Sequence, residues 1–170
     1  MKNFFSDLKV ASRDAAIFLR GKHEKFNNGL LCGENEFVAE CYTLLTKKNE
    51  AYHLRVVVNY SEAIQTEKVS TTLHPDLMLL DREGTKVIVE VKPVWGVQEG
   101  ASYLSPWDKR RIREDYHKLT DKYPNVSAKI LLVPFLGEVK DYDEDKFRWN
   151  AQKCIEKLVK KNIQVEVFTC

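Results

Sequence analysis

The sequence contains no apolar run that approaches the ~20 residues of a membrane-spanning helix, so we expect no contact with a membrane. Its four cysteines are scattered without a CxxC pair, which argues against a zinc site. The first 18 residues break their apolar positions with charged ones and do not read as a secretion signal. We therefore expect a cytoplasmic protein with reduced thiols.

The chain also lacks a strong charge of either sign, an internal repeat and a low-complexity tract. A formal net charge of +2 neither demands nor excludes a nucleic-acid partner. Apolar residues make up 44% of the 170 positions and charged residues 31%, which is typical of a globular protein. A chain of this length predicts one domain, residues 1–170, with a substantial core.

Hydrophobic periodicity predicts alternating helices and strands. The expected helices cover about 3–20, ending at Gly21, then 34–47, 106–123 and 143–161, and the expected strands cover 52–60, 76–80, 86–91, 128–135 and 163–168. Residues 61–71 read as a loop or a ragged edge. The order is helix, helix, three strands, helix, strand, helix, strand, which predicts an α/β protein with a mixed sheet flanked by helices.

The segment from His74 to Lys92 predicts a hairpin that carries charges inside apolar strands. A three-residue loop, Arg82 to Gly84, is a common connection, with glycine in the left-handed position. That loop sets a series of opposite pairs: Asp81 with Thr85, Leu80 with Lys86, Met78 with Ile88, Asp76 with Glu90, and His74 with Lys92. A loop of two or four residues would shift this register and set Asp76 against a valine.

In the predicted register, Asp76, Glu90 and Lys92 share one face of the hairpin, because strand side chains alternate. The two carboxylates lie opposite each other, with Cβ atoms ~5 Å apart, and repel. A hard divalent cation between them relieves the repulsion, and so does protonation of one acid. The alternative is an edge hairpin whose solvent face carries ordinary charges.

A third carboxylate is expected from the helix that begins at Glu34. Glu34 points along the apolar stripe of that helix and lies at its N-terminus, where the dipole favours an acid. Glu36 and then Glu40 are the alternatives. An acid in a first turn can also bend out to water, which leaves Glu34 without a role.

A helix glutamate, then a strand, then Pro75-Asp76, then Glu90-Val91-Lys92 resembles the PD-(D/E)xK nuclease superfamily. The match runs from about Glu34 to Phe135. The resemblance implies a restriction-endonuclease-like fold with the core order α-β-β-β-α-β, here with an extra N-terminal helix and a C-terminal α-β.

The resemblance also implies roles for individual residues. Asp76 and Glu90 would ligate Mg²⁺, for which Mn²⁺ can substitute, together with the carbonyl of Val91. Lys92 would orient the attacking water or stabilise charge on the phosphate. Glu34 would complete the site directly or through water.

The implied activity is a Mg²⁺-dependent endonuclease that hydrolyses DNA, and nucleases of this size often act as homodimers. Two alternatives stay open: an inactive nuclease-like module that binds nucleic acid or protein, and a metal-dependent RNase.

Further residues near the motif have two interpretations each. The basic run Lys109–Arg113 grips phosphates or forms a solvated helix face. Trp95 and Tyr103 stack on bases, belong to the core or form a lid. His74 touches a phosphate or is structural.

Overall fold

The structure is a computed structural model, and it describes residues 2–26, 33–48, 55–58, 62–66, 69–73, 75–81, 84–95, 104–123, 126, 128–137, 143–156 and 165–170. The helices are α1 (Lys2–Phe26), α2 (Glu34–Lys48), α3 (Pro106–Lys122) and α4 (Glu144–Ile155). The strands are β1 (Arg55–Val58), β2 (Glu62–Thr66), β3 (Val69–Leu73), β4 (Leu77–Asp81), β5 (Gly84–Val91), β6 (Ala128–Val133) and β7 (Val165–Thr169).

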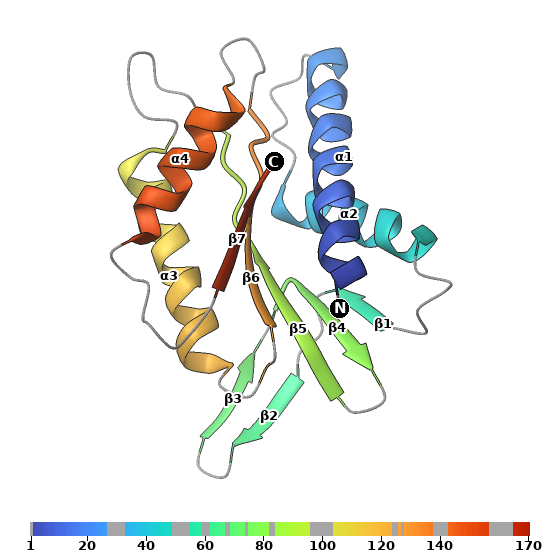
Figure 1. Cartoon of the computed structure of the whole chain (residues 1–170), viewed down its shortest axis with the longest axis vertical. Coiled ribbons are helices and arrows are strands. Elements are labelled where there is room, and N and C mark those ends of the chain that lie inside the picture. The colour runs from blue at the N-terminus through green and yellow to red at the C-terminus, as the bar shows by residue number, and fades with distance from the viewer. Residues whose placement is uncertain are drawn as a thin grey trace.

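Five of the strands form one mixed sheet in the order β1-β4-β5-β6-β7 (Figure 1). β1 pairs with β4 and β4 with β5 in antiparallel fashion, whereas β5 to β6 and β6 to β7 are parallel. β2 and β3 form a separate antiparallel pair. The expected α/β class with a mixed sheet is therefore confirmed.

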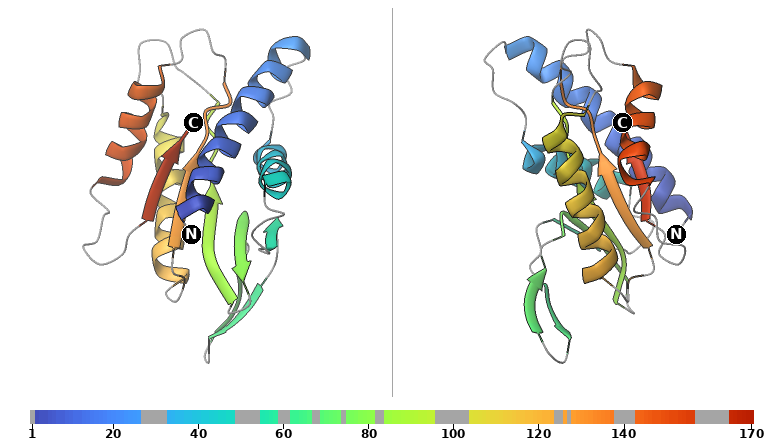
Figure 2. Two further views of the ribbon diagram at one scale, coloured as in Figure 1. Left: turned by 45° about the vertical axis from the view of Figure 1, so that its right-hand side comes forward. Right: turned by 90° about the vertical axis from the view of Figure 1, so that its left-hand side faces the viewer.

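Helices cover both faces of this sheet, with α1 and α2 on one side and α3 and α4 on the other (Figures 1 and 2). Side chains of β5 point alternately to the two faces of the sheet, and the core accordingly has two layers. Val87, Val89 and Val91 pack on the side of α1 and α2. Met78 and Ile88 pack on the side of α3 and α4. Side chains of β5 that share the face of Ile88 therefore point toward α3.

Two expectations about the elements were wrong. α1 does not stop at Gly21 but continues to Phe26. A glycine inside a helix costs only about 1 kcal/mol relative to alanine, and the buried face of α1 offsets that cost. Residues 61–71 were expected as a loop or a ragged edge, and those that the structure describes form strands of the β2–β3 pair rather than a loop, since β-branched residues such as Ile64 and Val69 favour strands.

α3 begins where the sequence predicted. The Ser105 side chain accepts a hydrogen bond from the Asp108 N–H, and the Asp108 carboxylate accepts one from the Ser105 N–H. This capping box, with Pro106 in the first turn, fixes where the helix starts over the sheet.

The β4–β5 hairpin keeps the predicted register far from its turn but not near it. Met78 lies opposite Ile88 as predicted, whereas Leu80 pairs with Thr85 rather than with Lys86. Asp81 pairs with Gly84 rather than Thr85, so only two residues lie between these partners; the two residues themselves lie outside the described part of the chain. A β-bulge between Leu79 and Leu80 shifts the register by one residue, and this shift compensates for the shorter connection.

Because of this bulge, Leu77 lies opposite Val89. Asp76 directly precedes Leu77 and Glu90 directly follows Val89, so the two acids meet at the open end of the hairpin. The predicted pairing of His74 with Lys92 lies outside the described residues, since His74 is not among them.

Candidate active site

The predicted acids and lysine gather where β5 leaves the sheet, on the side covered by α3. Glu90 and Lys92 are only 2% and 8% exposed, although both are charged residues. Ion pairs join them to α3 and to the first residue of α2. Buried charges of this kind need partners, and both residues have one of opposite charge at the site.

Asp76 is anchored to the strand that carries the other two motif residues. Its Oδ2 accepts a hydrogen bond of 2.6 Å from the Val91 N–H. Burial raises the pKa of Asp76 to about 6, the Val91 bond opposes that rise, and the charge of Glu34 adds to it. Asp76 is therefore a desolvated carboxylate held at a fixed place beside β5.

Glu90 is the most deeply buried acid of the cluster. The Lys118 Nζ lies 2.8 Å from its Oε1 and 2.8 Å from its Oε2, and the Tyr123 hydroxyl lies 3.4 Å from Oε1. Burial and then the charge of Asp76 raise the pKa of Glu90 to about 8, against the opposing effect of Lys118. Asp76 thus lies close enough to Glu90 for its charge to disfavour the ionised form of Glu90.

Lys92 bridges two acids from different helices. Its Nζ lies 3.0 Å from the Glu34 Oε2 and 3.0 Å from the Asp115 Oδ2. Burial alone would lower the pKa of Lys92, but Asp115 and Glu34 outweigh burial and raise it. Lys92 is therefore an ammonium at neutral pH. The Arg111 guanidinium lies 3.7 Å from the same Glu34 oxygen.

Of the three candidate glutamates of α2, the structure brings Glu34 to the motif through its contact with Lys92. Glu36 is exposed and accepts a hydrogen bond from the Gly33 N–H, 3.1 Å away. Glu40 is half-buried further along the helix. Glu34 occupies the first turn of α2, where the helix dipole favours a carboxylate.

Sequence reasoning missed the contribution of Asp115 and Lys118 on α3 and of Tyr123 at its C-cap. A signal was present, because Arg111, Asp115 and Lys118 have the spacing i, i+4, i+7 and so form a polar stripe along one side of the helix. That stripe borders an apolar stripe formed by Ile112, Tyr116 and Leu119. Polar side chains at the edge of a buried face are those that reach a neighbouring sheet.

The basic run Lys109–Arg113 does not act as one patch. Arg110 pairs with Glu114 at 3.3 Å on the exposed side, and the Arg113 Nε donates to the Cys154 carbonyl. Arg111 reaches the cluster through Glu34, and its guanidinium lies 4.4 Å from the centre of the Trp107 ring.

Of the two aromatic candidates, the structure describes Trp95 alone. Trp95 is half-buried and packs against the core, which agrees with its structural interpretation. Tyr103, like His74, lies outside the described residues.

The donor set of the cluster fits a hard cation. Asp76 and Glu90 offer carboxylate oxygens at one place, and a divalent ion between them would offset their burial and the charge of Asp76 on Glu90. The Lys92 N–H donates to Leu132 on β6, whereas the Val91 N–H points the other way, to Asp76. The N–H and carbonyl of one strand residue point to the same side, so the Val91 carbonyl also faces the edge where Asp76 lies.

Within the described residues, no three His, Cys, Asp or Glu side chains are grouped as a ready metal site.

Comparison with known proteins yields little likeness. No family model matches the chain, and no curated protein matches it. Among solved structures, SfsA from Pyrococcus furiosus, solved in complex with Ca²⁺, is similar at 14% sequence identity and a TM-score of 0.37. The match covers 78% of this chain and 55% of SfsA, so the chain spans about half the length of that protein.

Among the helices that the structure describes, none has the length and apolar character needed to cross a membrane.

Proposed function

We propose that this chain is a Mg²⁺-dependent nuclease of the PD-(D/E)xK type that hydrolyses phosphodiester bonds of DNA. The observation that carries the proposal is the buried pair of Asp76 and Glu90 at the end of β5, next to an ammonium at Lys92. The succession α2, β1, β4, β5, α3, β6 supports a restriction-endonuclease-like core, with β2–β3 as an insertion between its strands.

In this proposal, Asp76, Glu90 and the Val91 carbonyl hold Mg²⁺, and Mn²⁺ can replace it. When bound, the ion lowers the pKa of a water molecule and neutralises charge on the phosphate. Asp76 keeps its orientation through the Val91 N–H, and that bond also fixes the carboxylate relative to Glu90. Two carboxylates on one rigid hairpin give the preorganisation that a metal site needs.

Lys92 acts as a fixed positive charge in this mechanism. Glu34 and Asp115 favour its protonated form, so Lys92 carries a proton at Nζ and does not serve as a base. A preorganised ammonium in a site with little water stabilises negative charge that grows on the phosphate. Glu34 completes the site by holding Lys92, or by reaching the ion directly or through water.

A second candidate is a nuclease-like module that binds nucleic acid or protein without cleaving. The observation in its favour is that three of the four acids already have internal counter-ions, with Lys118 on Glu90 and Lys92 on Glu34 and Asp115. These ion pairs offset part of the buried charge without a metal.

One assay separates these candidates. The protein is incubated with plasmid DNA, single-stranded DNA and RNA, each with Mg²⁺, Mn²⁺ or EDTA. We expect metal-dependent cleavage of DNA that Asp76→Ala and Lys92→Ala each abolish, with circular dichroism confirming that both variants fold. Glu36→Ala, an exposed change on α2, is the matched control and should cleave like the wild type.

Each other result has a defined meaning. Cleavage that persists in both site variants comes from another site or a contaminant and removes the proposal. A gel shift of DNA without cleavage under any metal supports the binding module. Cleavage of RNA alone supports the third interpretation, a metal-dependent RNase.

A further inference from the structure

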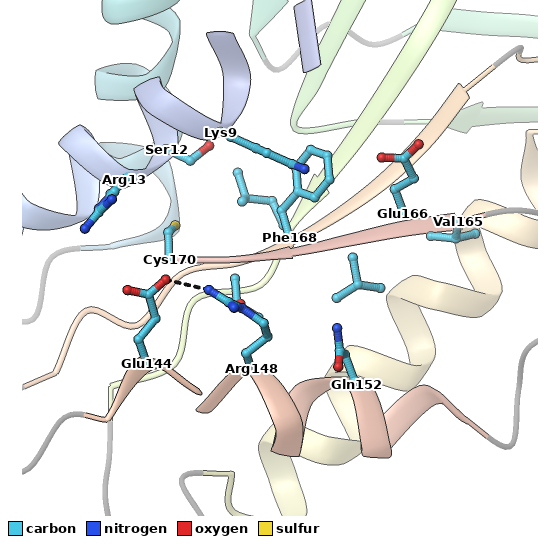
Figure 3. A pocket seen from close by; sticks show the side chains of 13 residues that line it. Lys9, Ser12, Arg13, Glu144, Arg148, Gln152, Val165, Glu166, Phe168 and Cys170 are labelled. Atoms are coloured by element: carbon cyan, nitrogen blue, oxygen red, sulfur yellow. Dashed lines mark hydrogen bonds and ion pairs between the residues drawn. The ribbon is translucent and has the colours of Figure 1, made fainter. Parts of the chain in front are cut away.

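β7 is an edge strand of the five-stranded sheet, separated by β6 from the strand β5 of the candidate active site, and its open edge lies in a groove. Within the described residues, β7 ends the strand order and pairs only with β6. Residues of α1 and α4 flank it and line, together with β7, a cavity of about 650 Å³ (Figure 3). An unpaired strand edge of this kind is a template for another strand.

The backbone of β7 shows which groups this edge offers. The Cys170 carbonyl accepts a hydrogen bond from the Phe135 N–H, so Cys170 points toward β6. Orientation alternates along a strand, so Phe168 and Glu166 also point toward β6. Val165, Val167 and Thr169 then direct their N–H and carbonyl groups into the groove. These are the donors and acceptors that an added strand would use.

The two faces of β7 differ in chemistry. Phe168 packs into the core on the side of α1, and the Lys9 Nζ lies 4.5 Å from the centre of its ring. Glu166 shares that face two residues away (Figure 3). On the side of α4, Val165 and Val167 pack against the other core layer.

We propose that this groove is a dimer interface in which β7 of a second copy adds to β7 in antiparallel fashion. A two-fold axis through Val167 pairs Val167 with its own copy and Val165 with Thr169. Every outward N–H and carbonyl of the strand then finds a partner on the other chain. The two sheets become one continuous sheet across the interface.

Charge complementarity selects this register and this partner. With Val167 on the axis, Glu166 of one copy lies opposite Phe168 of the other, where Lys9 sits over the ring. The Glu166 carboxylate of one copy then meets the Lys9 ammonium of the other, and the two-fold axis repeats this contact. A shift of the axis to Glu166 would instead set two glutamates against each other, which is unfavourable for like charges directly opposite.

The interface leaves both candidate active sites open. The lining residues of the groove include none of the cluster around Asp76, Glu90 and Lys92. The inference is therefore independent of the proposed function, and the oligomeric state can be measured without any nucleic acid or metal.

The test is sedimentation velocity over a dilution series of the full chain. We expect a reversible dimer for the wild type. Glu166→Lys and Lys9→Glu should each weaken dimerisation by about tenfold or more, because each sets like charges together twice. The double variant Lys9→Glu/Glu166→Lys should return to within a few-fold of the wild type.

Val167→Pro tests the backbone pairing separately. Proline removes the outward N–H but leaves the bonds to β6, since Val167 points away from β6. We expect this variant to be a folded monomer, with circular dichroism as the check of folding. If it does not fold, the charge-exchange series decides alone. A wild type that is monomeric at every concentration overturns the proposal, and so does a dimer that neither single charge reversal weakens.

Discussion

The Lys118 ammonium lies 2.8 Å from each carboxylate oxygen of Glu90. The Glu90 side chain is 3% exposed, whereas Lys118 is 32% exposed and reaches in from α3. An ammonium at this position neutralises the buried carboxylate as a metal ion would. The same oxygens are those that the proposed function assigns to Mg²⁺, so Lys118 and the ion compete for Glu90.

The competition predicts the effect of Lys118→Met on metal binding. Removing the ammonium frees both Glu90 oxygens, so Mn²⁺ should bind about tenfold more tightly or better, since close charge pairs of this kind are worth about 1.5 kcal/mol or more. Isothermal titration calorimetry with Mn²⁺ measures the change. In EDTA above pH 8, where Glu90 is ionised, the same variant should lose stability, by about 1–3 kcal/mol, because Glu90 is left buried without a charged partner.

Lys122→Met serves as the control, since Lys122 is an exposed lysine on the same helix. An affinity that is equal in the wild type and Lys118→Met would show that Lys118 does not stand where the ion binds. If neither protein binds Mn²⁺, the proposed metal-dependent function itself is wrong.

The second prediction concerns Lys92, which the proposal treats as a charge rather than a metal ligand. Lys92→Met should lower the rate of DNA cleavage by about 100-fold or more at saturating metal, the range seen when a preorganised electrostatic group is lost. Its affinity for Mn²⁺ should stay within a few-fold of the wild type. Single-turnover cleavage and calorimetry give the two readouts. A loss of metal binding that matches the loss of rate would instead make Lys92 a support of the ligands.

The sequence predicts the strands and the register far from the turn because alternation and apolar content are local properties. It does not predict the bulge near Leu79, since one extra residue on a strand changes the local pattern very little. Met78 still meets Ile88 because the shorter connection and the bulge cancel. The prediction that Asp76 and Glu90 meet therefore holds although the loop that supported it was wrong.

The partners from α3 illustrate a different limit. Asp115 and Lys118 follow from helical periodicity as a polar stripe, but their contacts with Lys92 and Glu90 depend on where α3 docks on the sheet. Docking is set by the apolar layer around Ile112 and Tyr116, that is, by tertiary packing. The position of Glu34 could be predicted from the sequence because Glu34 lies along the apolar stripe of α2, and that stripe faces the core.

The third prediction is a pH dependence of stability in the absence of metal. Burial first, and then the charges of Asp76 and Asp115, raise the pKa of Glu90 from 4.5 to about 8 against the effect of Lys118. A carboxyl whose pKa is higher in the folded state binds its proton more tightly there, so its contribution to stability is complete below its unfolded pKa. That contribution is lost as the pH rises from about 4.5 to about 8.

Chemical denaturation in EDTA at several pH values measures this loss. The free energy of unfolding should fall with pH across the window, by at most about 1.4 kcal/mol per pH unit for one group. Glu90→Gln should flatten the profile above pH 6, where Asp76 no longer contributes. Equal slopes for the wild type and the variant would contradict the assignment.

The last prediction contrasts two glycines, one at a close approach and one in open space. A Cβ at Gly137 would overlap the Trp95 carbonyl oxygen and come within 2.8 Å of the Phe135 ring, and backbone cannot yield cheaply. Gly137→Ala should therefore destabilise the fold by about 1–3 kcal/mol.

A Cβ at Gly21 would meet nothing within 4 Å, and Gly21 lies inside α1. Gly21→Ala should stabilise by about 0.5–1 kcal/mol, because alanine favours the helix. Thermal unfolding measures both variants, and we expect Tm to fall for Gly137→Ala and to rise for Gly21→Ala. Shifts of the same sign would contradict either the close approach of Trp95 to Gly137 or the continuation of α1 through Gly21.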